Sequence, residues 1–155
     1  MKNISTLSVR STCRLLTFAL ILVAIVSASC GKSKTGTDNS SSTATYSGTF
    51  VPSDGLDTTK AIGTVKATFD SSTLVLSYLI SWSSLTSIPV AMHFHDDGPV
   101  IVQLSGFPVS GTGNLEGKAT FTVAQGLDLA AGRIYAMIHT EKYPAGEIRA
   151  TLIRQ

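Results

Sequence analysis

Cysteine is scarce in this 155-residue sequence, which contains only Cys13 and Cys30. Both lie within the first 30 residues, outside the regularly patterned region that follows. Because that region contains no thiol, no disulfide can form within it, and a disulfide-stabilised secreted scaffold is excluded. The domain must therefore be held together by packing.

Charged residues are also few, at 14% of the chain, and the formal net charge is +2. The excess of positive charge comes from the N-terminus, because removal of Lys2, Arg10 and Arg14 leaves nine basic residues beside ten acidic ones. No basic patch remains that would predict binding to nucleic acid or to anionic lipid. We therefore expect no nucleic-acid partner.

No apolar run reaches the roughly 20 residues that a membrane-spanning helix needs. The longest, residues 15–26, is a mostly apolar segment that follows three basic residues and precedes the small residues 27–29. This order of basic, apolar and small residues is typical of a secretory signal. We predict a signal peptide over residues 1–29.

Cys30 follows directly, and the arrangement resembles a bacterial lipoprotein signal, in which the cysteine is acylated and becomes the new N-terminus. Ser27 departs from that pattern, which usually has leucine at this position. A conventional signal peptide with an incidental cysteine is the alternative. The resemblance implies an extracytoplasmic protein that a lipid anchors to the cell envelope, at the outer membrane.

Residues 30–45 are rich in serine, threonine and glycine and contain almost nothing apolar. A segment of this composition cannot bury enough surface to offset the entropy lost on ordering. We expect a flexible tether that holds the following domain clear of a membrane.

Residues 46–155 alternate between apolar and polar side chains in short segments that are separated by turn residues, which predicts a single all-β domain. Only residues 124–132 are expected to form a helical turn, ended by Gly132. The glycine-rich stretch 111–117 is predicted to be a loop and does not have the spacing of a dinucleotide-binding motif. The fold class is therefore a Greek-key-like antiparallel β-sandwich of about eight strands. The predicted strands cover residues 46–52, 62–69, 74–82, 89–95, 100–104, 117–123, 133–139 and 146–153.

Two of the chain's three histidines lie in the segment "VAMHFHDDGP", residues 90–99. Strand alternation places His93 and His95 on one face, while Val90, Met92 and Phe94 share the other. The second set is apolar and should face the core. The two imidazoles should then project together from the outer face.

The last two predicted strands are joined by a hairpin loop, and one register pairs His139 with Glu147. In that register Ile138 faces Ile148, so one side of the hairpin is entirely apolar, while Met137 faces Arg149 on the other side. We therefore expect Glu147 beside His139 on the outer face. All three histidines should lie outside the core on one shared surface.

The segments "AMHFHDDGPVIVQL" and "LAAGRIYAMIHTEKYPAGEIRATL" together resemble the CHRD (chordin-type) domain over nearly all of residues 46–155. The resemblance implies an extracellular β-sandwich, and in animals the domain occurs in chordin, which binds secreted growth factors. The segment between His95 and Gly98 is shorter here than the glycine-rich loop that the family often has. The family's closing signature stands at Gly132, Tyr135, His139, Thr140, Pro144, Gly146, Glu147, Ile148 and Arg149.

A weaker likeness is to copper/zinc superoxide dismutase. It would make His93, His95 and His139 copper ligands and Arg149 the arginine that guides the anion. No histidine remains to bridge copper to zinc, and the zinc-binding loop and the disulfide are missing. We therefore expect no dismutase activity.

Two functions fit these features. The first is a non-catalytic binding or adhesion module whose partner is an envelope or extracellular protein or a glycan. The second is a copper or zinc site formed by the three histidines, with Asp96, Asp97 and Glu147 as candidate carboxylate ligands. The signature residues can alternatively serve the fold alone. We predict no catalytic residues, since no G-x-S-x-G motif or retained cysteine nucleophile is present.

Overall fold

The computed structural model describes residues 41–53 and 58–155, which belong to one compact unit, Asp38–Gln155. The predicted signal peptide, Cys30 and most of the predicted tether lie outside the described residues. Within the described residues, no helix combines the length and the apolar character needed to cross a membrane.

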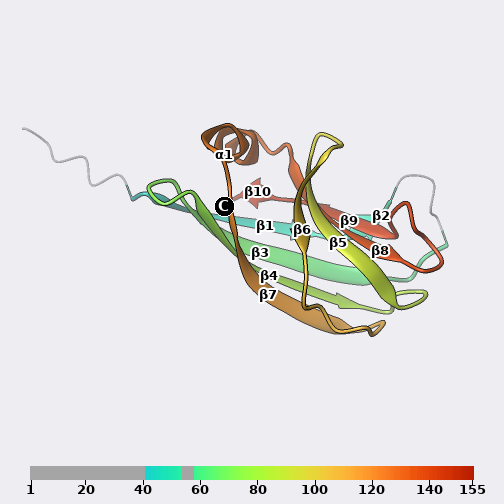
Figure 1. Ribbon diagram of the computed structural model, residues 1–155. Helices are drawn as coiled ribbons and strands as arrows, with labels where there is room; N and C mark the ends of the chain where they lie inside the picture. The colour runs from blue at the N-terminus through green and yellow to red at the C-terminus, as the bar shows by residue number, and fades with distance from the viewer. Residues whose placement is uncertain (1–40, 54–57) are drawn as a thin grey trace, which may run out of the picture. The chain divides into compact units, whose positions relative to one another are not determined.

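The described chain folds into two antiparallel sheets of five strands each, which pack face to face (Figure 1). Sheet 1 has the order β10-β1-β3-β4-β7, and sheet 2 has the order β2-β9-β8-β5-β6. The predicted all-β sandwich is thereby confirmed. The strands of sheet 1 are β1 (Thr43–Thr49), β3 (Ile62–Asp70), β4 (Val75–Ser83), β7 (Gly113–Thr120) and β10 (Ile153–Arg154). Those of sheet 2 are β2 (Val51–Pro52), β5 (Pro89–Asp96), β6 (Val100–Leu104), β8 (Ile134–Thr140) and β9 (Ile148–Thr151).

The chain crosses between the sheets at two buried residues, Phe50 and Leu152. At Phe50 the chain passes from β1 in sheet 1 to β2 in sheet 2. At Leu152 it returns from β9 in sheet 2 to β10 in sheet 1. The sequence predicted one continuous strand at each place, because alternation shows which side chains are buried but not which sheet carries them. Strand β1 also begins at Thr43, so the predicted tether ends earlier than residue 45.

Aromatic side chains from both sheets meet in the core, and Phe94 of β5 stands at their centre. Its ring contacts Tyr78 of β4 edge to face, with centroids 5.2 Å apart, and lies 6.3 Å from the ring of Phe121. Met92 of the same strand is fully buried, as alternation predicted. Val90 is not buried. The residue is 51% exposed, because an irregularity between Pro89 and Ala91 interrupts the alternation.

Strand β7 begins inside the stretch that was predicted to be a glycine-rich loop. Gly113 pairs with Trp82 and Gly117 pairs with Tyr78 across the β4–β7 ladder. A Cβ atom at Gly113 would come within 2.8 Å of the indole ring, and one at Gly117 would collide with the phenol oxygen. These glycines leave room for the aromatic rings of the neighbouring strand, a known device in sheets that sequence alternation does not reveal.

The predicted helical turn is a short helix, α1 (Val123–Ala130), at one end of the sandwich (Figure 1). Thr122 caps its N-terminus by accepting a hydrogen bond from the backbone N–H of Gln125, whose side chain accepts one from the backbone of Thr122. This reciprocal pair is a capping box. Gly132, with φ of +73°, follows the helix at the predicted place.

We predict that Phe94→Ala lowers the free energy of unfolding by about 3–5 kcal/mol, because it leaves a cavity between the two sheets. Chemical denaturation monitored by circular dichroism measures this loss. Val90→Ala in the same strand is the matched control and should change stability by less than about 0.5 kcal/mol, since Val90 is exposed. Equal effects of the two substitutions would contradict the assigned core.

Candidate metal centre

The three histidines of the chain lie together on the outer face of sheet 2. His93 and His95 come from β5, and His139 comes from the neighbouring strand β8. In the β5–β8 ladder Ala91 pairs with His139, so the His139 ring is diagonal to that of His93. One nitrogen atom from each ring lies within 4.8 Å of the other two. The structure thus brings together the three rings that the sequence placed on one surface.

Backbone carbonyl groups orient two of these rings. The Nδ1 atom of His95 is 2.8 Å from the carbonyl oxygen of Gly98, and the Nδ1 atom of His139 is 2.9 Å from that of Pro144. A carbonyl oxygen only accepts hydrogen bonds, so each Nδ1 carries the proton and donates it. The lone pair of each neutral ring is then on Nε2. Metal-binding histidines usually have this arrangement, in which one ring nitrogen donates to a protein oxygen atom and the other faces the metal.

The third ring, His93, has its Nδ1 atom 3.2 Å from the Nε2 atom of His139. Because that Nε2 atom is an acceptor, the Nδ1–H group of His93 donates. Burial, followed by the electrostatic effects of His139 and His95, holds the pKa of His93 below its ordinary value of 6.5. His93 is therefore neutral at neutral pH, the form that binds a metal ion.

His95 is more deeply placed than the sequence predicted, with only 7% of its surface exposed. The ring of Tyr135, its partner across the β5–β8 ladder, stacks on it at 4.9 Å and an interplanar angle of 5°. His95 therefore lies on the predicted outer face, but the sequence did not predict its burial, because the covering ring comes from a neighbouring strand. Its Nε2 atom is buried and has no hydrogen-bond partner.

The spacing of the three nitrogen atoms is close to that of a metal site. Points at most 4.8 Å apart all fall within about 2.8 Å (4.8 Å divided by √3) of one centre. Bonds from zinc to histidine nitrogen are about 2.0–2.1 Å long. If each ring moved toward the centre by less than about 1 Å, all three nitrogen atoms would lie at bonding distance from one ion.

The three candidate carboxylates do not join this group, which consists of the histidines alone among the described residues. Asp97 is exposed, and its carboxylate lies 3.7 Å from Arg133. Asp96 ends strand β5 and its backbone N–H group donates to Pro99 in the turn. Glu147 is fully buried, so its predicted position on the outer face beside His139 was wrong.

Glu147 instead binds three threonine hydroxyl groups inside the sandwich. Thr59 and Thr86 donate to Oε1 over 2.5 and 2.7 Å, and Thr140 donates to Oε2 over 2.8 Å. The backbone N–H group of Thr86 adds a fourth bond of 2.9 Å. Gly146, with φ of +115°, redirects the chain just before β9 begins, so Glu147 does not continue the outer-face alternation.

The pKa of Glu147 reflects two opposing effects. Burial, the largest single effect, raises it, but the hydrogen bonds from Thr59, Thr86 and Thr140 together outweigh burial and hold it below its ordinary value of 4.5. The carboxylate is therefore charged and ties three loops together. Thr59 and Thr86 lie 88 and 61 residues from Glu147 in the chain, so no local pattern pointed to them.

A family model for the CHRD domain matches residues 42–152. This chain belongs to the CHRD domain family. No curated protein and no solved structure shows significant similarity to it.

The signature residues of this CHRD domain surround the histidines and Glu147. Tyr135 stacks on His95, and the guanidinium of Arg149 lies 6.0 Å from the centroid of the Tyr135 ring. Pro144 supplies the carbonyl oxygen that orients His139. Gly146 packs against Met137, where a Cβ atom would collide with the thioether sulfur. The signature therefore supports the histidine cluster as well as the fold.

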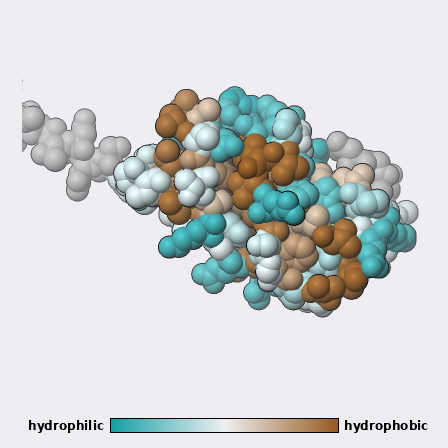
Figure 2. All heavy atoms as spheres, viewed as in Figure 1, coloured by the Kyte–Doolittle hydropathy of each residue, from teal (hydrophilic) through white to brown (hydrophobic). Residues whose placement is uncertain are grey.

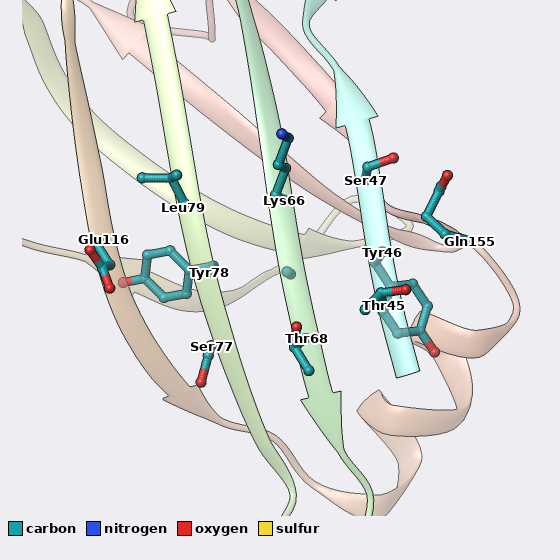
Figure 3. Close-up of a pocket in the computed structure, with 11 residues that line it drawn as sticks. Thr45, Tyr46, Ser47, Lys66, Thr68, Ser77, Tyr78, Leu79, Glu116 and Gln155 are labelled. Atoms are coloured by element: carbon teal, nitrogen blue, oxygen red, sulfur yellow. The ribbon is translucent and has the colours of Figure 1, made fainter. Parts of the chain in front are cut away.

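The outer face of sheet 1 carries a shallow pocket of about 620 Å³ that is separate from this cluster (Figure 3). Lys66, Ser77 and Glu116 stand on its neighbouring strands, and no histidine lines it. The residues that line this pocket do not form a group of metal-binding side chains, so the histidine cluster remains the candidate site.

We predict that Glu147→Gln lowers the free energy of unfolding by about 1–3 kcal/mol at neutral pH, because an amide cannot accept all the hydrogen bonds of the carboxylate. The folded-state pKa of Glu147 lies below the unfolded value, so its contribution is complete above pH 4.5 and is lost as pH falls through the folded pKa. Denaturation at pH 7 and at pH 3 should therefore show a smaller pH dependence for the variant.

Glu116→Gln is the matched control for this prediction, since Glu116 is an exposed carboxylate on β7. It should leave neutral-pH stability unchanged. If both variants lost the same stability, the hydrogen bonds from the three threonine residues to Glu147 would not be a stabilising feature.

Proposed function

We propose that this CHRD domain binds one copper or zinc ion through His93, His95 and His139. The observation that carries the proposal is the buried Nε2 atom of His95, which has no hydrogen-bond partner, in a ring of which one nitrogen lies within 4.8 Å of a nitrogen of each of the other two histidines. An unsatisfied buried acceptor costs about 1–3 kcal/mol, and an ion would remove that cost. Three neutral imidazoles suit copper and zinc.

The role that we propose is binding without catalysis. No carboxylate of the described residues lies with the three imidazoles to act as a general base. On binding, His93 would release its hydrogen bond to His139, losing the proton from Nδ1 and carrying one on Nε2 instead. The freed lone pair of Nδ1 of His93, with those of Nε2 of His95 and His139, would then hold the ion. The carbonyl oxygens of Gly98 and Pro144 would keep two of the rings in place.

The N-terminal sequence supports an extracytoplasmic location for this module. A signal peptide over residues 1–29 and acylation of Cys30 would anchor the chain to the cell envelope, at the outer membrane. The segment after Cys30 would then tether the CHRD domain outside the cytoplasm.

Metal retention tests the proposed site. The purified protein is incubated with copper or zinc, desalted and analysed by mass spectrometry for bound metal. We expect about one equivalent of metal in the wild type. His93→Ala and His139→Ala should each lower the affinity for the metal by more than roughly 10–100-fold, the loss that follows when a residue that only hydrogen-bonds to a metal ligand is removed. Both rings are only half-buried, so the variants should fold.

Gln103→Ala is the matched control, because Gln103 is an exposed residue paired with His93 across the β5–β6 ladder. It should retain the ion. A folded wild-type protein that leaves the desalting column without metal would refute the proposal.

One observation favours a second function, the binding of an envelope or extracellular protein or glycan. Exposed edge strands usually carry charge or proline, which hinders the addition of another strand. In the described structure β2 carries Pro52, β10 carries Arg154, and β7 carries Glu116 and Lys118. The fourth edge strand, β6, has the sequence VIVQL and carries neither. An extended segment of a partner could pair with it.

We predict that Val100→Lys, which adds a charge to the exposed end of β6, reduces the capture of cross-linked envelope components by the purified domain. Val109→Lys is the matched control, since Val109 is also exposed but lies outside every strand of the described residues. Capture that is identical in both variants and the wild type would exclude this edge as the binding surface.

A further inference from the structure

The face that helix α1 turns toward solvent is apolar. This apolar stripe consists of five exposed residues with the spacing of one helical face, the last of them just past the end of the helix: Val123, Ala124, Leu127, Ala130 and Ala131. Val123 and Leu127 are 65% and 67% exposed. The space-filling view shows hydrophobic side chains at the surface around α1 (Figure 2). On a domain that is surrounded by water, the solvent face of a helix normally carries charge.

The polar residues of α1 lie outside this apolar stripe and have partners. Gln125 closes the capping box with Thr122. Asp128 forms an ion pair with Arg133. The stripe itself therefore contains no charged or hydrogen-bonding side chain, and its outward face has no partner within the described structure.

A hollow of about 360 Å³ adjoins the stripe and is lined mainly by apolar side chains, among them Phe69, Leu74 and Leu127. Ser41 and Ser42, the first described residues, form part of its rim. The apolar surface thus lies where the described chain begins. Cys30 is eleven residues before Ser41, a length of chain that reaches at most roughly 40 Å when fully extended.

We infer that the stripe and the hollow rest on the lipid bilayer to which the chain is anchored. This inference rests on the proposed acylation of Cys30. A short tether confines the domain near the membrane, so that even a small apolar surface can dock. The N-terminal segment would then determine where the domain is held, and α1 would determine which end faces the lipid.

Lipid-borne quenchers test this docking on the acylated chain, reconstituted in vesicles of phosphatidylethanolamine and phosphatidylglycerol. A fluorophore is attached to Leu127→Cys or, as the matched control, to Thr68→Cys on the exposed outer face of sheet 1 (Figure 3). The mature chain offers no competing thiol once Cys30 is acylated. We expect strong quenching at position 127 and little at position 68.

A second variant links the quenching to the stripe itself. Val123→Asp combined with a fluorophore at Ala130→Cys should weaken docking roughly tenfold relative to the same label on the Val123 background, because a charge replaces a valine that would contact the lipid. Val123 is exposed in the domain, so the substitution should not disturb folding.

Four outcomes would overturn the inference. Equal quenching at positions 127 and 68 would show that α1 does not face the lipid. Energy transfer between labels at position 127 of different copies, without lipid quenching, would assign the stripe to self-association. Intact-mass measurement of the mature chain reports acylation separately: an acylated chain without quenching refutes the docking alone, whereas an unacylated Cys30 refutes the anchoring and the docking together.

Discussion

The pairing of β5 with β8 determines where all three imidazole rings lie. Met92 and Phe94 must face the core from β5, and Ala136 and Ile138 must do so from β8. Because side chains alternate with a period of two, the residues between them are forced onto the outer face. A slip of one residue would bury the rings and expose Phe94. The stability of the sandwich thereby enforces the geometry of the candidate metal centre.

The parts of the structure that could be predicted from sequence are those that alternation alone decides. The hairpin register of β8 with β9 was predicted correctly, with Ile138 opposite Ile148 and Met137 opposite Arg149. The shared face of His93 and His95 followed from the same rule. These are local or near-neighbour relations, in which one apolar face leaves a single acceptable register.

The rest depended on partners that come from distant parts of the chain. The burial of His95 follows from Tyr135 of the neighbouring strand, and the inward position of Glu147 follows from Thr59 and Thr86. Gly113 is predicted to be a loop residue, and only the structure shows that it pairs with Trp82 and leaves room for its ring. In each case a single backbone conformation or a ring from another strand overrides the local pattern.

The two oriented histidines are held by main-chain oxygen atoms, at Gly98 in the β5–β6 turn and at Pro144 in the β8–β9 loop. Every amino acid carries such an oxygen, so replacing the side chain at Pro144 does not by itself remove the acceptor. Insertions or deletions in either loop would move it, even if all three imidazoles were kept. Among natural variants, selection for this centre would therefore act on loop length and backbone path more strongly than on the identity of the loop side chains.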